Sequence, residues 1–138
     1  MGRRDGAHSA QVGDSRCYSV RSSQAVCPTR DDTVVQNMLE DGSITAADVP
    51  NVPFRNVLTR AVGAVEQADP SYRRETLEEG DVLLLCSDGL TDSVPEYRWL
   101  EIQKESGGME RTVQALIDAG LANEAGDNVS VVLLTLEY

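Results

Sequence analysis

The fold is decided by residues 80–92, which read GDVLLLCSDGLTD. A glycine and an aspartate form a turn before five consecutive apolar residues, and Ser87-Asp88-Gly89 ends the run. A short, uninterrupted apolar run between turn signals is typical of a strand that is covered on both faces. Residues 82–86 are therefore predicted to form a central strand of a sheet, with Asp88 just beyond its end.

The other predicted strands lie on both sides of this stretch. Residues 128–136 contain a second uninterrupted apolar run, which again indicates a strand inside a sheet. Further extended segments are predicted over residues 7–13, 16–21 and 56–62, and residues 43–53 are predicted to form a short helical turn followed by a loop.

Three helices are predicted between these strands. Residues 29–32 (TRDD) supply a hydroxyl cap and acids for a first turn, and the helix that follows ends before Gly42. Residues 93–96 (SVPE) supply a capping serine, an early proline and a glutamate, and this helix runs to about Ser106. A third amphipathic helix follows from Met109.

The composition indicates one ordinary globular domain. The chain has 138 residues, of which 41% are hydrophobic and 25% are charged, so residues 1–138 are predicted to form a single domain. The formal net charge of −11 repels phosphate backbones and argues against nucleic-acid binding. No apolar run approaches the ~18 residues of a membrane helix, and no basic-then-apolar start indicates a signal peptide.

The cysteines and the histidine exclude several kinds of site. Cys17, Cys27 and Cys86 are odd in number and have no C-x-x-C spacing. This argues against a disulfide framework or a zinc site and fits a reducing, cytoplasmic compartment. His8 is the only histidine and lies near the first residue, so a Ser-His-Asp or Cys-His hydrolase is not expected.

Four aspartates stand beside a glycine or a turn: Asp14, Asp88, Asp92 and Asp127. Asp88 ends a buried strand, where a lone carboxylate is costly unless it is paired or bound to a cation. Asp92 is four residues later, so one turn of chain can aim both carboxylates at one place. Ligands that are all oxygen select hard cations such as Mg²⁺ or Mn²⁺, which can activate water and neutralise a phosphoryl group. The alternative, that each aspartate only forms a turn or caps a helix, stays open at this point.

Five motifs follow one another along the chain: GDSRCY (13–18), TRDDTVVQ (29–36), NVLTRAVG (56–63), GDVLLLCSDGLTD (80–92) and GDNVSVV (126–132). In sequence and in order they resemble the metal-dependent serine/threonine phosphatases of the PPM, or protein phosphatase 2C, family, in its bacterial branch. The resemblance covers nearly the whole chain. It implies an α/β (α+β) fold that forms part of an α-β-β-α sandwich, in which two mainly antiparallel sheets are flanked by helices.

The resemblance also implies a reaction and its metal ligands. A hydroxide that bridges two Mn²⁺ or Mg²⁺ ions would hydrolyse phosphoserine and phosphothreonine in proteins, among them a Ser/Thr kinase. Asp88 and Asp127 would ligate one ion of this pair. Asp14 and Asp92, with help from Asp88, would hold a third, weaker ion.

Four further residues take supporting roles by the same resemblance. Asn128 and Gly89 would hold the metal ligands in place from behind, Asn128 by orienting Asp127. Arg16 matches its motif and is expected to be structural. Asp32 stands where the family usually has histidine, and this difference is expected to be peripheral.

One family motif has no counterpart before Gly13. Family domains begin with strands that carry Asp-Gly-x-Gly-Gly, whose aspartate bridges the two ions, whereas Asp5-Gly6 is followed here by Ala7-His8. The chain is therefore expected to be the C-terminal part of a phosphatase domain, truncated at the N-terminal side, with exposed sheet edges that favour self-association. Two alternatives to an active phosphatase are a catalytically inactive domain, kept as a binding module or a remnant, and an acidic domain that binds cations in its turns.

Overall fold

Two antiparallel sheets form the frame of the protein. The computed structural model describes residues 4–21, 24–55, 57–64, 66–67, 69–123 and 126–135. Strand β1 (Arg4–Gln11) pairs with β4 (Ser71–Glu78) in a two-stranded ribbon. The larger sheet has the order β3 (Gln24–Val26), β2 (Arg16–Arg21), β5 (Val82–Cys86) and β6 (Val131–Thr135), so the predicted strand over residues 82–86 lies inside it.

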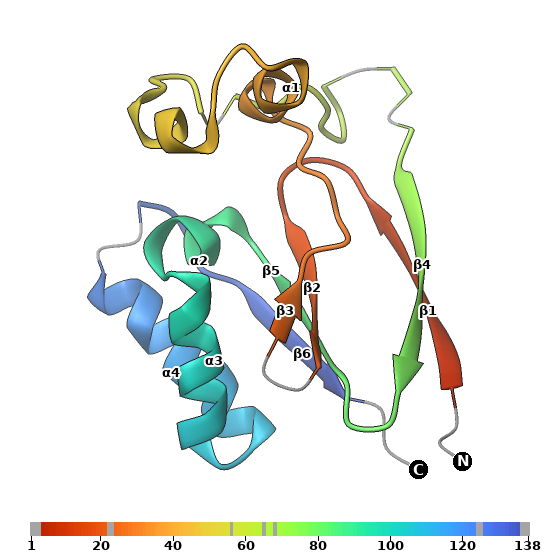
Figure 1. Ribbon diagram of the computed structural model, residues 1–138, viewed down its shortest axis with the longest axis vertical. Helices are drawn as coiled ribbons and strands as arrows, with labels where there is room; N and C mark the ends of the chain where they lie inside the picture. Colours follow the sequence, from red (N-terminus) through yellow and green to blue (C-terminus); the bar gives the residue numbers. More distant parts are fainter. Residues whose placement is uncertain are drawn as a thin grey trace.

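The helices lie at one face and one end of the larger sheet. They are α1 (Val34–Asp41), the 3₁₀ helix η1 (Ala46–Asn51), α2 (Asp88–Ser93), α3 (Glu96–Ser106) and α4 (Met109–Ala122). Figure 1 shows α2, α3 and α4 on one side of the four-stranded sheet and the β1–β4 ribbon on the other, with α1 at the end where β2 begins and β5 finishes. The molecule is therefore layered as helices, sheet and ribbon.

The hydrophobic core lies between the larger sheet and the helices. The strand register places Tyr18 beside Leu84 and Leu84 beside Leu133. The rings of Tyr18 and Trp99 of α3 pack in a T-shaped arrangement with 4.8 Å between the ring centroids. The buried cluster consists of Tyr18, Leu84, Cys86, Leu90, Val94, Trp99, Ile102 and Leu116.

The prediction that the apolar strands are covered on both faces is only partly correct. Leu85, Val132 and Leu134 point away from the helices and are 39%, 52% and 51% exposed. A hollow of about 430 Å³ lies between β1 and the ends of β5 and β6, so the ribbon does not close this side. The uninterrupted apolar runs therefore place apolar side chains on both faces of the sheet, of which one is covered by helices and the other is partly open.

Two predicted helix starts are wrong for local reasons. Helix α1 begins at Val34, after Thr33, whose hydroxyl accepts the N–H of Gln36 at 3.1 Å; the acids before it serve tertiary contacts instead. Helix α3 begins after Pro95, because Ser93 belongs to the end of α2 and its hydroxyl donates to the carbonyl of Gly89 at 2.5 Å.

Other differences concern segments with weak sequence patterns. Strand β4 is mostly polar and was not predicted, since it is defined by pairing with the distant β1. The strand predicted over residues 56–62 is wrong: residues 57–62 are irregular, with a single bridge between Leu58 and Thr33, and Asn56 lies outside the described residues. The predicted strand over 16–21 and the helical turn within 43–53 are confirmed.

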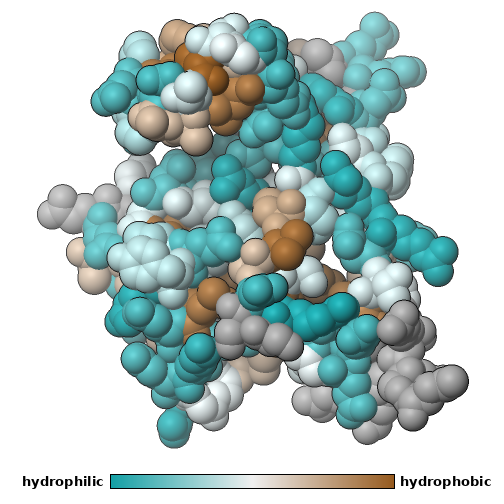
Figure 2. Space-filling model, viewed as in Figure 1, coloured by the Kyte–Doolittle hydropathy of each residue, from teal (hydrophilic) through white to brown (hydrophobic). Residues whose placement is uncertain are grey.

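The surface in Figure 2 is mainly hydrophilic, with separate hydrophobic patches, as a net charge of −11 leads one to expect. Within the part of the chain that the structure describes, no helix is long and apolar enough to cross a membrane.

We predict that Leu116→Ala lowers the free energy of unfolding by about 2–5 kcal/mol, because Leu116 is 1% exposed and the substitution leaves a cavity. Urea denaturation followed by circular dichroism measures the change. The matched control is Leu121→Ala in the same helix, since Leu121 is 64% exposed and its loss should change stability by less than about 0.5 kcal/mol. Equal losses in the two variants would contradict the described core.

Candidate metal centre

Strand pairing brings Asp14 and Asp88 together. Asp14 lies in the turn between β1 and β2, and Asp88 is the first residue of α2, separated from the end of β5 by Ser87 alone. Because β2 and β5 are antiparallel, with Arg16 opposite Cys86, the start of one strand and the end of the other lie at the same edge of the sheet. The two aspartates, 74 residues apart in sequence (88 − 14 = 74), therefore share one site.

The electrostatics of this pair show how close the carboxyl groups are. Burial, the negative charge of Asp88 and a hydrogen bond to Asp88 together raise the pKa of Asp14 to about 6. Two carboxyl groups close enough to share a hydrogen bond cannot both ionise freely without a counter-charge between them. The pair is therefore a place where a proton or a cation is favoured.

Asp92 joins the pair from the next turn of α2. Loss of hydration raises the pKa of Asp92, and the charge of Asp88 adds to this effect. The positive charges of Arg55 and Arg16 oppose it. The spacing of four residues thus directs Asp88 and Asp92 to the same region, as the sequence predicts.

These three aspartates line one small hollow of about 80 Å³ beneath α1 and η1. A fourth carboxylate, that of Asp31, lies in the same wall and was missed, because the sequence indicates a helix start at residues 29–32. The lining residues are Asp14, Arg16, Asp31, Thr33, Val35, Val49, Arg55, Asp88, Thr91 and Asp92.

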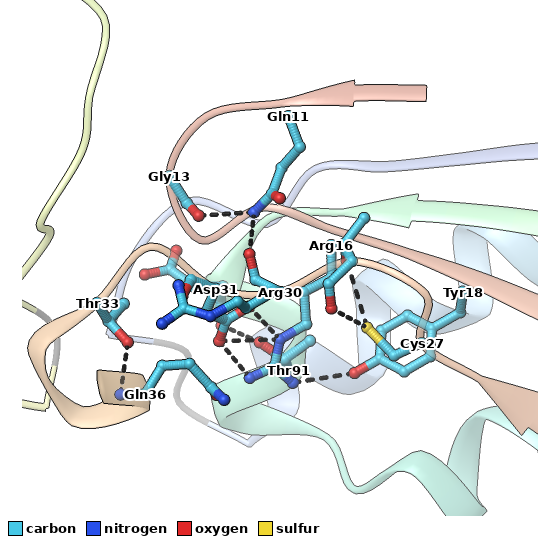
Figure 3. A network of polar contacts seen from close by, with 12 residues as sticks. Gln11, Gly13, Arg16, Tyr18, Cys27, Arg30, Asp31, Thr33, Gln36 and Thr91 are labelled. Atoms are coloured by element: carbon cyan, nitrogen blue, oxygen red, sulfur yellow. Dashed lines mark hydrogen bonds and ion pairs between the residues drawn. The ribbon is translucent and has the colours of Figure 1, made fainter. Parts of the chain in front are cut away.

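Arg16 ties Asp31 to the core, as Figure 3 shows. Its guanidinium donates to both carboxylate oxygens of Asp31, from Nε at 2.9 Å and from Nη2 at 2.6 Å, and Nη1 donates to the hydroxyl of Tyr18 at 3.0 Å. This two-point pair raises the pKa of Arg16 well above its ordinary value. Arg16 therefore has the structural role expected for it, and it neutralises the fourth acid of the hollow.

Asp127 lies outside this hollow in the structure. Its Oδ1 accepts the backbone N–H of its neighbour Asn128 at 2.7 Å, and the residue is exposed. Within the described ranges, no group of three histidine, cysteine, aspartate or glutamate side chains is arranged to hold a metal ion. The expected joint ligation by Asp88 and Asp127 is thus not formed in this conformation and stays a prediction.

The loop that carries Asp127 is nevertheless fixed beside Asp88. The N–H of Ser87 donates to the carbonyl of Ser130 at 3.0 Å, and the hydroxyl of Ser87 donates to the carbonyl of Asn128 at 3.2 Å. A Cβ at Gly89 would overlap that same Asn128 carbonyl, so glycine is required there. Ser87 thus joins the two chain segments by hydrogen bonds, and Gly89 allows the Asn128 backbone to come close.

The aspartate that stands where the family usually has histidine is an interior residue. Asp32 is 2% exposed, and its carboxylate accepts a backbone N–H of the turn that carries Asp14. It does not line the hollow, and the expectation that this difference is peripheral to function stays a prediction.

Comparison with known proteins agrees with the family that the sequence motifs resemble. A family profile described as Stage II sporulation protein E (SpoIIE) matches residues 45–137. Serine/threonine phosphatase stp of Listeria innocua is 34% identical over 125 residues, which are 91% of this chain and 50% of that protein. The chain therefore spans about half the length of this relative.

Solved structures agree in fold. The serine/threonine phosphatase PstP/Ppp of Mycobacterium tuberculosis superposes with a TM-score of 0.89 at 32% identity, over 96% of this chain and 56% of that chain. The catalytic domain of PstP in complex with two manganese ions gives a TM-score of 0.80 at 32% identity, over 96% and 54% of the two chains.

The fold is thus that of the metal-dependent bacterial serine/threonine phosphatases, and the predicted α/β class with antiparallel sheets and helices is confirmed. The chain belongs to the SpoIIE family of PPM, or protein phosphatase 2C-type, phosphatases and covers part of their catalytic domain.

We predict that the pKa of Asp14 is about 6 in the metal-free protein and falls in Asp88→Asn while staying above its ordinary 3.8, because the neighbouring charge is removed but the burial, which is the larger cause, remains. Carboxyl ¹³C NMR titration measures both values. Asp118→Asn, an exposed change on α4, is the control and should leave the pKa of Asp14 unchanged.

The sign of the pH dependence follows from the same shift. The folded protein binds this proton more tightly than the unfolded chain does, so the stability that it contributes is lost as the pH rises from about 4 to about 6. An Asp14 pKa near 3.8 in the wild-type protein would contradict the described pair.

Proposed function

We propose that this chain contributes the acidic side of a phosphatase centre that hydrolyses phosphoserine and phosphothreonine in proteins. The observation that carries the proposal is the hollow where Asp14, Asp88 and Asp92 meet, at the rim of a sheet that this chain shares with bacterial serine/threonine phosphatases. Phosphoproteins, including a Ser/Thr kinase, would be the substrates.

The hollow fits a hard divalent cation. Asp14, Asp88 and Asp92 would hold one Mn²⁺ or Mg²⁺ ion, because the donors are all carboxylates and their mutual repulsion favours a cation among them. Asp88 and Asp127 would hold a further ion of a pair, and the bond from the N–H of Asn128 to Oδ1 of Asp127 leaves the second carboxylate oxygen for that ion. A relative, the PstP catalytic domain, contains two manganese ions. When bound, such ions neutralise phosphoryl oxygens and lower the pKa of a coordinated water.

Residues behind the hollow would keep the ligands in place. Arg16 holds Asp31 by two hydrogen bonds, so that one of the four acids already has a counter-charge. Gly89 lets the Asn128 backbone approach, which keeps the Asp127 loop beside Asp88.

A catalytically inactive phosphatase-like domain is the second candidate, acting as a binding module or as a remnant. It is supported by the place of Asp127, which is exposed and lies outside the hollow where Asp14, Asp88 and Asp92 meet. Such a domain would bind a cation or a phosphoprotein without turnover.

We also propose a reducing, cytoplasmic location and self-association. Cys17, Cys27 and Cys86 are all free thiols, which fits a reducing compartment. Strand β6 is the last strand of its sheet in the part of the chain that the structure describes, and its Val132 and Leu134 are exposed. An apolar edge strand is a template for pairing with a second chain.

The phosphatase proposal predicts Mn²⁺-dependent release of phosphate from a phosphothreonine peptide, measured by a colorimetric phosphate assay. Asp88→Asn should lower the rate by at least about 100-fold, because a metal contributes several kcal/mol and about 1.4 kcal/mol corresponds to a factor of ten. Asp118→Asn is the control: it removes the same negative charge at an exposed position and should leave the rate unchanged.

The outcomes of this assay separate the candidates. Activity that survives in Asp88→Asn would refute the site, and a wild-type protein that binds Mn²⁺ but releases no phosphate would favour the inactive domain.

For self-association, we predict that light scattering at a concentration on the order of 50 µM detects dimers or larger species of the wild-type protein. Val132→Lys should lower the dimer fraction, because it places a charge on the exposed edge strand. Leu121→Lys, at an exposed apolar position on α4, serves as the control. A monomer at this concentration would contradict the prediction.

A further inference from the structure

Asp32 is bonded to both backbone groups of Gly13, the residue before Asp14. The carboxylate Oδ2 of Asp32 accepts the N–H of Gly13 at 3.0 Å. The N–H of Asp32 in turn donates to the carbonyl of Gly13 at 2.8 Å. Both bonds are buried or nearly so, since Asp32 is 2% exposed. Gly13 is thus held at two points by one residue that lies 19 positions away (32 − 13 = 19).

These two hydrogen bonds to Gly13 restrict the direction of the Asp14 side chain. The carbonyl of Gly13 belongs to the peptide unit that leads into Asp14, so fixing its orientation fixes the nitrogen and Cα of Asp14 and leaves only rotation about φ and χ1 to direct the side chain. Gly13 has φ of 103°, a conformation that glycine adopts freely and that would not hold the turn by itself. The side chain of Gln11 donates to the same carbonyl at 2.7 Å and to the carbonyl of Arg30 at 2.8 Å, as Figure 3 shows.

Asp32 itself is fixed from two further sides. Its carbonyl accepts the N–H of Thr59 at 2.9 Å. Its Oδ1 lies 3.7 Å from Nη1 of Arg30 and 3.8 Å from Nη1 of Arg60. Two guanidinium groups thus face one buried carboxylate, which offsets the cost of keeping its charge out of water.

We propose that Asp32 is a positioning residue, which holds the Gly13–Asp14 turn so that the carboxylate of Asp14 stays beside Asp88. Its consequence for metal binding rests on the proposed function, whereas its effect on the order of the turn does not. Removing a residue that positions a metal ligand typically lowers metal affinity by about 10–100-fold.

Asp81 supplies a matched control. It is also a buried carboxylate, 3% exposed, that accepts a backbone N–H, from Glu78 at 2.8 Å, and pairs with an arginine, Arg21, at 2.6 Å. It precedes β5, whereas Asp88 follows that strand, so the two lie at opposite ends. Asp81→Ala therefore removes a similar buried acid without touching the Asp14 turn.

The test combines a metal-free and a metal-dependent measurement on the full chain. By ¹⁵N relaxation, the order parameters of the Asp14 and Ser15 amides should fall from about 0.85 to below about 0.6 in Asp32→Ala and stay high in Asp81→Ala. In calorimetric titration with Mn²⁺ alone, Asp32→Ala should weaken binding by about 10–100-fold, in the direction of Asp14→Ala, with Asp81→Ala changed by less than about threefold. Asp32→Asn keeps an acceptor for the Gly13 N–H and should restore the order of the turn.

Each outcome of these measurements supports or overturns the role of Asp32. Order parameters that stay near 0.85 in Asp32→Ala, or that fall equally in Asp81→Ala, overturn the proposal. Should Asp32→Ala not fold, Asp32→Ser, whose hydroxyl is too short to reach Gly13, carries the same comparison. A wild-type protein with no Asp14-dependent Mn²⁺ binding refutes the metal centre, and the relaxation data then judge Asp32 independently.

Discussion

The antiparallel pairing of β2 with β5 is the constraint on which the candidate centre depends. It places the start of β2 and the end of β5 at one edge of the sheet, so that Asp14 and Asp88, each two residues beyond a strand end, face each other. Two negative charges this close to each other oppose folding unless a proton or a cation lies between them. The apolar residues of the two strands, packed against the helices, supply the stability that keeps this unfavourable pair in place.

The hollow and the core are one connected structure. Asp31 is bonded to Arg16, Arg16 is bonded to the hydroxyl of Tyr18, and the ring of Tyr18 packs against Trp99 in a T-shaped arrangement. The wall of the acidic hollow is thereby anchored to the most deeply buried part of the molecule. A polar network with each member bonded, next to a packed aromatic pair, is rigid, and rigidity is what a site made of repelling groups requires.

Segments with a strong local pattern were predicted well, and segments defined by distant partners were not. The apolar strand over residues 82–86 and the helix from Met109 follow from periodicity and turn residues alone. Strand β4 has a polar sequence and exists because β1 pairs with it. The acids of residues 29–32 have the composition of a helix start, yet Asp31 and Asp32 are held by Arg16 and Gly13 instead.

The chemistry of the site can be predicted from residue type and local spacing: which aspartates stand at turns, that they offer a metal ion only oxygen ligands, and that Asp88 and Asp92 lie one helical turn apart. Which carboxylates meet follows from the tertiary structure, because this depends on strand register and loop docking. The tertiary structure brought Asp31 into the hollow, buried Asp32 behind Asp14, and left Asp127 bonded to the N–H of its neighbour.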